Sequence, residues 1–366
     1  MASGPQDIYE FTIAYKGPDQ AVDYQLARNL YAVQEKAWEK YAAEKRLPNS
    51  RSKRKKLIRK GVPPNLRPWV WFEVSGAKQL MVSQPGNSYY PNLVKAAASM
   101  SKVSSQVELD LPRTFPGHPY LSCPTTGQVA MRRILTSYSL RNPKVGYCQG
   151  LNFIVGVMLM AMDRNEEHTF WLLAALVENI CYQGSFGENL CGCHVEMKTL
   201  QDLVAAKIPR LGAHMKAITC DISLIATDWF LTVYCVSMPP ESACRVLDAL
   251  LNEGAKVLFR VALGLLKTAE ARLLRLDNAD SHHRLGPAGE LMKWVKDFVA
   301  SILHIEPIME VAFDGIGRLS LSKVDSVRKA KALEVQAFME ERRQKASPHS
   351  NGASPGVGTG NRSTGT

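Results

Sequence analysis

The sequence predicts an all-α protein. From about residue 60 to residue 305, apolar side chains recur at the three- and four-residue spacing of amphipathic helices. Sustained alternation of apolar and polar residues, which marks half-buried strands, is nearly absent, so we expect few strands or none. The 366 residues, 46% hydrophobic and 22% charged, fit a globular protein of about two domains with a full core.

Start and stop signals divide this helical region into elements. A turn at residues 59–66 leads into a tryptophan-bearing helix. Asn165 precedes two glutamates and an apolar stripe, which is the pattern of a capped helix. Another helix opens at Pro239 and ends before Gly254, a residue typical of helix C-termini. The other predicted helices cover residues 20–44, 151–162, 196–206, 255–274, 290–302 and 323–343.

The two ends of the chain differ from this region in composition. We expect residues 1–50 to form a helical extension and residues 306–345 a C-terminal helical segment. Residues 51–58 are strongly basic, and we expect a linker there between the extension and the main body. Residues 346–366 are rich in glycine, serine and threonine, which predicts a disordered tail.

The charge and the cysteine content limit the class of partner and the cellular compartment that we expect. The formal net charge of +11 favours an anionic partner: nucleic acid, a lipid surface or an acidic protein. The eight cysteines are too dilute for a disulfide scaffold, and the N-terminus lacks a signal-peptide pattern. No apolar run reaches the roughly 18–20 residues of a transmembrane helix. We therefore expect a cytoplasmic protein that is neither secreted nor membrane-spanning.

A basic run that begins at Arg51 and ends at Lys60 is open to three interpretations. The three interpretations are a contact for anionic lipid, a nuclear localisation signal and a solvated linker, of which the linker is the simplest. A nucleic-acid interface is not expected, because no basic helix carries interleaved stacking aromatics.

Motifs for nucleotide triphosphate binding and for hydrolysis are missing. The sequence has no GxxxxGK[ST] loop and no HExxH, so we expect no cofactor and no autonomous active site. Residues 191–194 read CGCH, but a zinc site needs a second pair of ligands. We expect a loop with free thiols there, and no metal.

Two pairs of polar residues lie close to apolar segments of the sequence. Asp110 and Arg113 are three residues apart, so on a short helix they share one face and can form an ion pair. Tyr147 and Gln149 lie between two glycines, in a loop that enters the apolar run beginning at Leu151. Side chains in such a position serve recognition more readily than core packing.

These segments resemble the TBC domains, which act as GTPase-activating proteins for Rab-type small GTPases. The resemblance covers residues 59–305 and rests on three motifs in the family's order. They are an RGxPxxLRxxxW-like opening at 59–71, an IxxDxxR-like motif at 107–113, and YxQ at 147–149. The sequence departs from the family at Lys60, which is inserted in the opening motif, and at Leu247, where the family often has tryptophan.

The resemblance implies a V-shaped helical body with lobes at residues 59–180 and 181–305. It also implies that Arg113 is an arginine finger, inserted toward the phosphates of GTP held by a partner, and that Gln149 orients the attacking water. The chemistry suits these side chains. A planar guanidinium neutralises phosphoryl charge bidentately, while a carboxamide can accept from water and donate at the same time.

Supporting roles follow from the same resemblance. We expect Asp110 to hold Arg113, with Arg67 as a second partner of that carboxylate, and Tyr147 to position its loop. Asn152 completes the set of candidate supporting and partner-binding residues. Tryptophans and Phe259 at the family's apolar positions are expected in the core.

The implied partner is a Rab-family GTPase in the GTP-bound state, which itself holds the GTP and Mg²⁺. The implied function is GTPase activation in membrane traffic, in the cytoplasm and peripherally on endomembranes. The alternative is a non-catalytic scaffold or effector of the same fold. A non-catalytic relative is expected to have lost a finger residue; both Arg113 and Gln149 are present, which favours catalysis.

Overall fold

The computed structural model describes residues 5–346 except residues 14, 16, 85, 87, 99–100, 188 and 277–285. Its described part is helical, and an isolated antiparallel bridge joins Gln6 to Thr12. The expected all-α fold is confirmed. The α-helices are α1 (Pro18–Glu44), α2 (Arg51–Arg59), α3 (Arg67–Val74), α4 (Ala77–Val82), α5 (Tyr89–Ala98), α6 (Ser101–Asp110), α7 (Gly127–Arg141), α8 (Leu151–Ala161), α9 (Glu166–Ala175), α10 (Cys191–Lys207), α11 (Pro209–Ala217), α12 (Ser223–Leu231), α13 (Pro240–Glu253), α14 (Lys256–Leu273), α15 (Gly286–Ala300), α16 (Glu306–Glu310) and α17 (Leu321–Ala346).

Shorter turns complete the fold. The 3-10 turns are η1 (Pro64–Leu66) and η2 (Leu111–Arg113), and the π-helical turns are η3 (Leu176–Ile180) and η4 (Val311–Gly315). The predicted start and stop signals act as expected. Asn165 caps α9 by accepting a hydrogen bond from the His168 amide, and Gly254 ends α13 with a φ of 82°.

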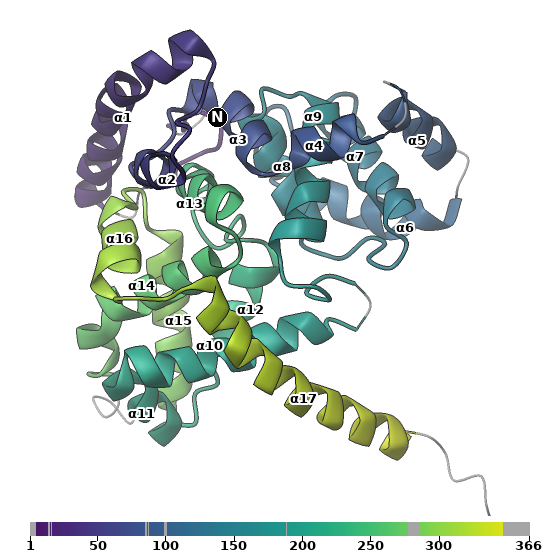
Figure 1. Ribbon diagram of the computed structural model, residues 1–366. Helices are drawn as coiled ribbons and strands as arrows, with labels where there is room; N and C mark the ends of the chain where they lie inside the picture. Colours follow the sequence, from purple (N-terminus) through teal and green to yellow (C-terminus); the bar gives the residue numbers. More distant parts are fainter. Residues whose placement is uncertain are drawn as a thin grey trace, which may run out of the picture.

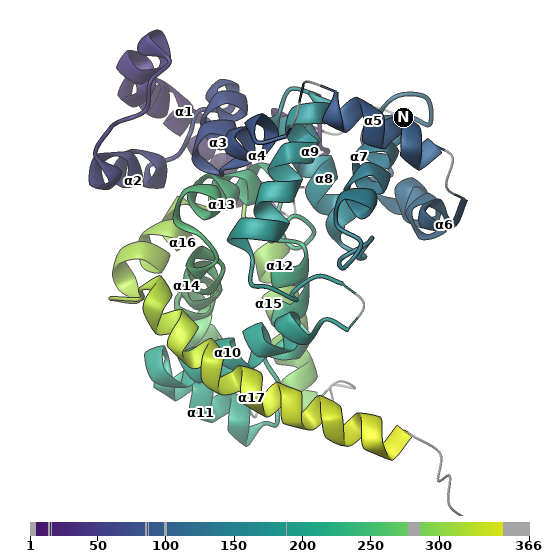
Figure 2. The same ribbon diagram turned by 45° about the vertical axis from the view of Figure 1, so that its right-hand side comes forward.

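Two groups of helices meet along α13. Figures 1 and 2 show α3–α9 on one side and α10–α16 on the other, which is the two-lobed arrangement. Helix α13 packs against α2, α3, α8 and η3, and on its other side against α14. Its sequence permits this because nearly every side chain from Ser242 to Leu251 is buried. Leu247, at the position where tryptophan was expected, is fully buried there.

One large apolar cluster runs through both groups. It contains Trp71, Trp171, Trp229 and Phe259, as predicted for the family's apolar positions. Trp69 is half-buried instead and packs on a second, small cluster around Trp38.

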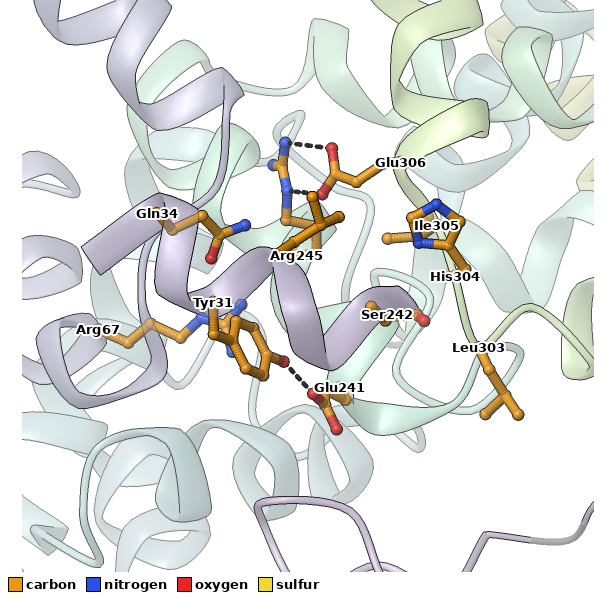
Figure 3. Close-up of a pocket in the computed structure, with 12 residues that line it drawn as sticks. Tyr31, Gln34, Arg67, Glu241, Ser242, Arg245, Leu303, His304, Ile305 and Glu306 are labelled. Atoms are coloured by element: carbon orange, nitrogen blue, oxygen red, sulfur yellow. Dashed lines mark hydrogen bonds and ion pairs between the residues drawn. The ribbon is translucent and has the colours of Figure 1, made fainter. Parts of the chain in front are cut away.

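Helix α1 packs on the body. The fully buried Trp38 donates from Nε1 to the carbonyl oxygen of Gly61 at 2.8 Å. The hydroxyl of Tyr31 donates to Glu241 at the start of α13, as the dashed line in Figure 3 marks. A cavity of about 30 Å³ lies between α1, α13 and the segment before α16.

The expected linker at residues 51–58 was wrong, because these residues form helix α2. Ser50 caps α2 by accepting a hydrogen bond from the Lys53 amide at 3.4 Å, and the side chain of Ile58, within α2, is fully buried. On the side facing α13, Lys55 at 3.0 Å and Arg59 at 2.9 Å bind the carboxylate of Glu253. Burial raises the pKa of this carboxyl, but the hydrogen bonds from its cationic neighbours outweigh it and lower the pKa to about 2.

Two further expectations have structural outcomes. Residues 191–194 are the first turn of α10 and not a loop, because Cys193 packs into the core; all eight cysteines are free thiols. The predicted disordered tail at residues 346–366 lies outside the described residues except for Ala346, which ends α17.

Helix α17 lies along α10, as Figure 1 shows. Its Arg328 is buried and donates from Nε to Glu196 of α10 at 2.7 Å. None of the helices in the described ranges is both long and apolar enough to span a membrane.

Candidate functional site

Arg113 projects from the turn that follows α6. Pro112 lacks the N–H that would continue the α-helical ladder, so the chain leaves α6 at Asp110 and forms η2. The Asp110 side chain is fully buried, whereas the Arg113 side chain is 54% exposed. The two form the ion pair that their spacing predicted, through Nη2 of Arg113 and Oδ1 of Asp110. Among the described residues, Asp110 is the hydrogen-bonding partner of this guanidinium, and its other N–H groups face outward unpaired.

Gln149 lies in the loop between α7 and α8. Gly146 and Gly150 flank it with φ values of 60° and 109°, a region that glycine adopts without steric cost. A side chain at Gly150 would also place its Cβ 3.0 Å from the carbonyl oxygen of Leu231. Gln149 is exposed, and its carboxamide makes no hydrogen bond with the described residues. The two glycines therefore allow a loop conformation in which the Gln149 carboxamide is exposed and unpaired among the described residues.

Tyr147 connects the two loops. Its hydroxyl donates to Oδ2 of Asp110, the carboxylate whose other oxygen holds Arg113. Burial, and then the hydrogen bond to Asp110, raise the pKa of Tyr147 well above its ordinary value. The phenol therefore stays a donor at any physiological pH, and its expected positioning role has a geometric basis.

Asn152 makes a second connection between the loops. Its Nδ2 donates to Oγ1 of Thr114 at 2.7 Å, and its Oδ1 accepts from the Gly150 amide at 3.0 Å. Thr114 in turn donates from Oγ1 to the carbonyl oxygen of Asp110 at 2.7 Å. Asn152 and Thr114 are both buried. One amide side chain thus links the residue after Arg113 to the residue after Gln149.

The prediction that Arg67 contacts Asp110 was wrong. Arg67 is buried and binds Asp248 of α13, with Nε 3.1 Å from Oδ1 and Nη2 3.3 Å from Oδ2. Trp71 donates to the same carboxylate at 2.8 Å. Asp248 lies on α13, which packs against α3, so it is within reach of Arg67. Arg67 therefore stabilises the junction of the two lobes.

Sequence reasoning missed three residues that the structure brings to the site. Thr114 is the bridge described above, and only its position beside Arg113 could have suggested it. Leu109, next to Asp110, is 67% exposed and gives the site an apolar surface. Phe115 has a φ of 48°, which is unusual for a bulky residue and marks a constrained turn.

The arrangement presents one guanidinium and one carboxamide from neighbouring loops. It contains no base paired with a nucleophile, and among the described residues no group of three or more His, Cys, Asp or Glu is arranged to hold a metal ion. A guanidinium and a carboxamide together can bind a phosphoryl group and a water molecule, with five N–H donors on one side chain and both a donor and an acceptor on the other.

Comparison with known proteins places this chain in a family. The model of the Rab-GTPase-TBC domain matches residues 64–274. TBC1 domain family member 2A of Mus musculus is 34% identical over 288 residues, which are 78% of this chain. The chain spans about 30% of the length of that relative.

Solved structures agree. The Chlamydomonas flagellar RabGAP TBC domain is 41% identical, with a TM-score of 0.76 over 85% of this chain and 100% of that one. The Ypt/Rab-GAP domain of Gyp1p, 19% identical, shares the fold with a TM-score of 0.60 over 73% of this chain and 92% of that one. The chain therefore belongs to the Rab-GTPase-TBC domain family.

Proposed function

We propose that this protein accelerates GTP hydrolysis on a Rab-family GTPase in its GTP-bound state. Arg113 moves from Asp110 toward the transferring phosphoryl group and neutralises the charge that develops there. Gln149 accepts a hydrogen bond from the attacking water and donates from its amide, which orients the water in line. The GTPase supplies the nucleotide and Mg²⁺, and residues 59–305 act as the activating domain.

The observation that carries this proposal is the pair of bridges between the two loops. Asp110 joins Arg113 to Tyr147, and Asn152 joins Thr114 to Gly150. Both candidate finger side chains are thus exposed while the backbone beneath them is held by buried groups. A site whose first contacts are free and whose supports are buried is organised to act on a bound partner.

The partner surface includes more than the fingers. Leu109 is exposed beside η2 (Leu111–Arg113), the finger turn, and offers apolar area to a GTPase. An arginine finger generally contributes about 10³–10⁵ in rate, which corresponds to roughly 4–7 kcal/mol of activation free energy. Positioning by the neighbouring surface is needed for that gain.

Transition-state-analogue binding tests the proposal. A Rab GTPase loaded with GDP and aluminium fluoride should bind the wild-type chain at least about 100-fold more tightly than the same GTPase loaded with GDP alone. Arg113→Ala should lose this preference. Arg210→Ala, which removes an exposed arginine of α11, should keep it.

Equal binding of the two nucleotide states by the wild-type chain would contradict the proposal. Tight binding to the GTP-bound form, without preference for the analogue, would instead assign the chain to the non-catalytic scaffolds and effectors.

A cytoplasmic protein that is peripheral on endomembranes, where lipidated GTPases reside, suits this activity in membrane traffic. The basic run at residues 51–60 supports such a placement, because Arg51, Lys53 and Lys56 are exposed on α2. Binding to vesicles of about 30% phosphatidylserine should fall steeply as salt is added. Salt screens the attraction between exposed charges, and the Debye length is about 8–10 Å near physiological ionic strength. The triple change R51Q, K53Q and K56Q should abolish it and leave the Glu253 ion pairs intact. Salt-insensitive binding, or none, would contradict the membrane contact.

A further inference from the structure

Residues 5–13 form a compact hairpin beside the finger turn. Oδ1 of Asp7 accepts from the amides of Tyr9 and Phe11, both at 2.9 Å, and the Asp7 amide donates to the Phe11 carbonyl oxygen at 2.9 Å. Tyr9, Phe11 and Ile13 are buried. This hairpin lies outside residues 64–274, the part of the chain that the family model matches.

The hairpin contacts the chain just after Arg113. The Phe11 ring meets the Phe115 ring edge-to-face at 4.9 Å, and it meets the His118 ring at 4.4 Å. The carbonyl oxygen of Tyr9 lies 2.7 Å from Nε2 of His118. Nδ1 of His118 accepts from the amides of Tyr120 and Leu121 at 3.1 Å, so Nε2 carries the proton and donates to Tyr9. Burial lowers the pKa of His118, which favours this neutral form.

Phe115 needs such support. It lies two residues after Arg113 and adopts a φ of 48°, a conformation that a bulky residue keeps only where its surroundings hold it. Its ring is held between Phe11 and Phe153, the latter at 5.4 Å, and a Cβ at Gly156 would come within 3.0 Å of it. No regular helix covers residues 114–126, so these side-chain anchors set the path of the chain.

The hairpin is also fixed at its other end. The hydroxyl of Tyr9 accepts from Nη1 of Arg67 at 2.6 Å, and Arg67 binds Asp248 at the junction of the lobes. Among the described residues, none of the hydrogen bonds and ring contacts of the hairpin reaches residues 146–150, which carry Gln149. Its support is therefore directed to the Arg113 side of the site.

We propose that the 5–13 hairpin positions the arginine finger, with Phe11 as the positioning residue that acts through Phe115. This inference rests on the proposed function of Arg113. Without the Phe11 ring, Phe115 is free to leave its constrained conformation, and the Arg113 turn loses its defined aim. Partner binding, which uses the wider surface, is unaffected.

A double-mutant cycle in the full chain tests this inference. Phe11→Ala should lower the maximal rate of stimulated GTP hydrolysis by about 10- to 100-fold, because small misplacements of a catalytic group have effects of that size. Its affinity for the GTP-bound GTPase should stay unchanged. In the Arg113→Ala background the same substitution should have no further effect on the rate, since it acts through Arg113.

Two companion variants separate positioning from general loss of structure. Ile13→Ala removes another buried side chain of the same hairpin but leaves the Phe11–Phe115 ring contact in place, and it should keep the wild-type rate. Phe11→Leu keeps an apolar side chain without the ring edges. It should recover part of the rate, and it takes the place of Phe11→Ala in the cycle if that variant fails to fold.

A wild-type rate for Phe11→Ala, an equal loss with Ile13→Ala, or an undiminished effect in the Arg113→Ala background would overturn the inference while leaving the proposed function standing. If Arg113→Ala itself stimulates hydrolysis like the wild type, the proposed function fails and this inference fails with it.

Discussion

Asn152 and Thr114 are 38 residues apart in the sequence and are joined by a hydrogen bond of 2.7 Å. Thr114 follows Arg113, and the oxygen of the same Asn152 side chain accepts from the amide after Gln149. This buried carboxamide thus joins the two candidate finger loops, in addition to the bridge from Asp110 to Tyr147. This connection leads to the first prediction.

Asn152→Ala should reduce stimulated GTP hydrolysis by about 10- to 100-fold although both finger residues remain. The substitution removes the hydrogen bond that the Thr114 oxygen accepts and leaves the Gly150 amide unpaired, so the two loops lose a common anchor. The free energy of unfolding should fall by about 1–3 kcal/mol, the usual effect of leaving buried polar groups unpaired. Single-turnover hydrolysis and urea denaturation measure the two effects.

Ser137→Ala is the matched control for Asn152→Ala. Ser137 is fully buried in α7, and its hydroxyl makes no hydrogen bond in the described part of the chain. Removing it should leave hydrolysis at the wild-type rate. Full activity of Asn152→Ala would show that the fingers do not need the anchor that Asn152 provides.

Arg113→Lys should be nearly as inactive as Arg113→Ala. An ammonium group keeps the charge but lacks the planar fork that binds two phosphoryl oxygens at once. Both variants should lose about 10³–10⁵ of the stimulated rate. Thermal unfolding of Arg113→Lys should change little, because the side chain is half exposed and the ammonium group can still pair with Asp110. A lysine variant that retains most of the activity would remove Arg113 from the finger role.

Asp248→Ala should destabilise the protein by about 3–5 kcal/mol, since it leaves the buried guanidinium of Arg67 without its counter-charge. The same carboxylate accepts from the Trp71 indole and from the Val62 amide at 3.1 Å. Urea denaturation measures the loss. Asp325→Ala, which removes an exposed partner of Arg328, is the control and should change the free energy of unfolding by under about 1 kcal/mol. Similar losses from the two substitutions would contradict the role of Asp248 as the junction.

Asp7 should make stability depend on pH. Burial, and then the nearby Glu241 carboxylate, raise its pKa from 3.8 to about 7. The folded chain therefore holds this proton more tightly than the unfolded chain. The resulting stabilisation is complete below pH 3.8 and is lost as the pH rises to about 7, by up to about 4 kcal/mol for a shift of roughly three pH units.

Asp7→Asn tests this dependence, because the amide keeps an oxygen to accept from Tyr9 and Phe11. Relative to the wild type, the variant should gain stability as the pH rises from about 4 to about 7, as measured by urea denaturation at each pH. A constant difference across that range would show that Asp7 does not titrate in it.

The helices and the Asp110–Arg113 ion pair could be predicted from the sequence because both depend on local spacing. Asn165 as a cap, Gly254 as a stop and the three-residue spacing of Asp110 and Arg113 act within one or two helical turns. Such features need no knowledge of the tertiary fold.

The predictions that were wrong concerned features that depend on contacts between residues distant in the sequence. Arg67 binds Asp248, 181 residues away, and no local pattern identifies that partner. Residues 51–58 have few apolar side chains, so the helix they form is stabilised by burial of Ile58 and by ion pairs to Glu253 of α13. The bridging position of Asn152 likewise depends on a tertiary contact, its hydrogen bond to Thr114.

Single-turnover GTP hydrolysis by a panel of Rab GTPases, with the wild-type chain, Arg113→Ala and Gln149→Ala in parallel, tests the central claim most directly. Gln25→Ala, which changes an exposed glutamine of α1, is the control for Gln149. The account predicts stimulation by about 10³-fold or more on at least one Rab, lost in both finger variants and kept in the control. Wild-type stimulation that survives either finger substitution, or no stimulation on any Rab despite GTP-dependent binding, would contradict it.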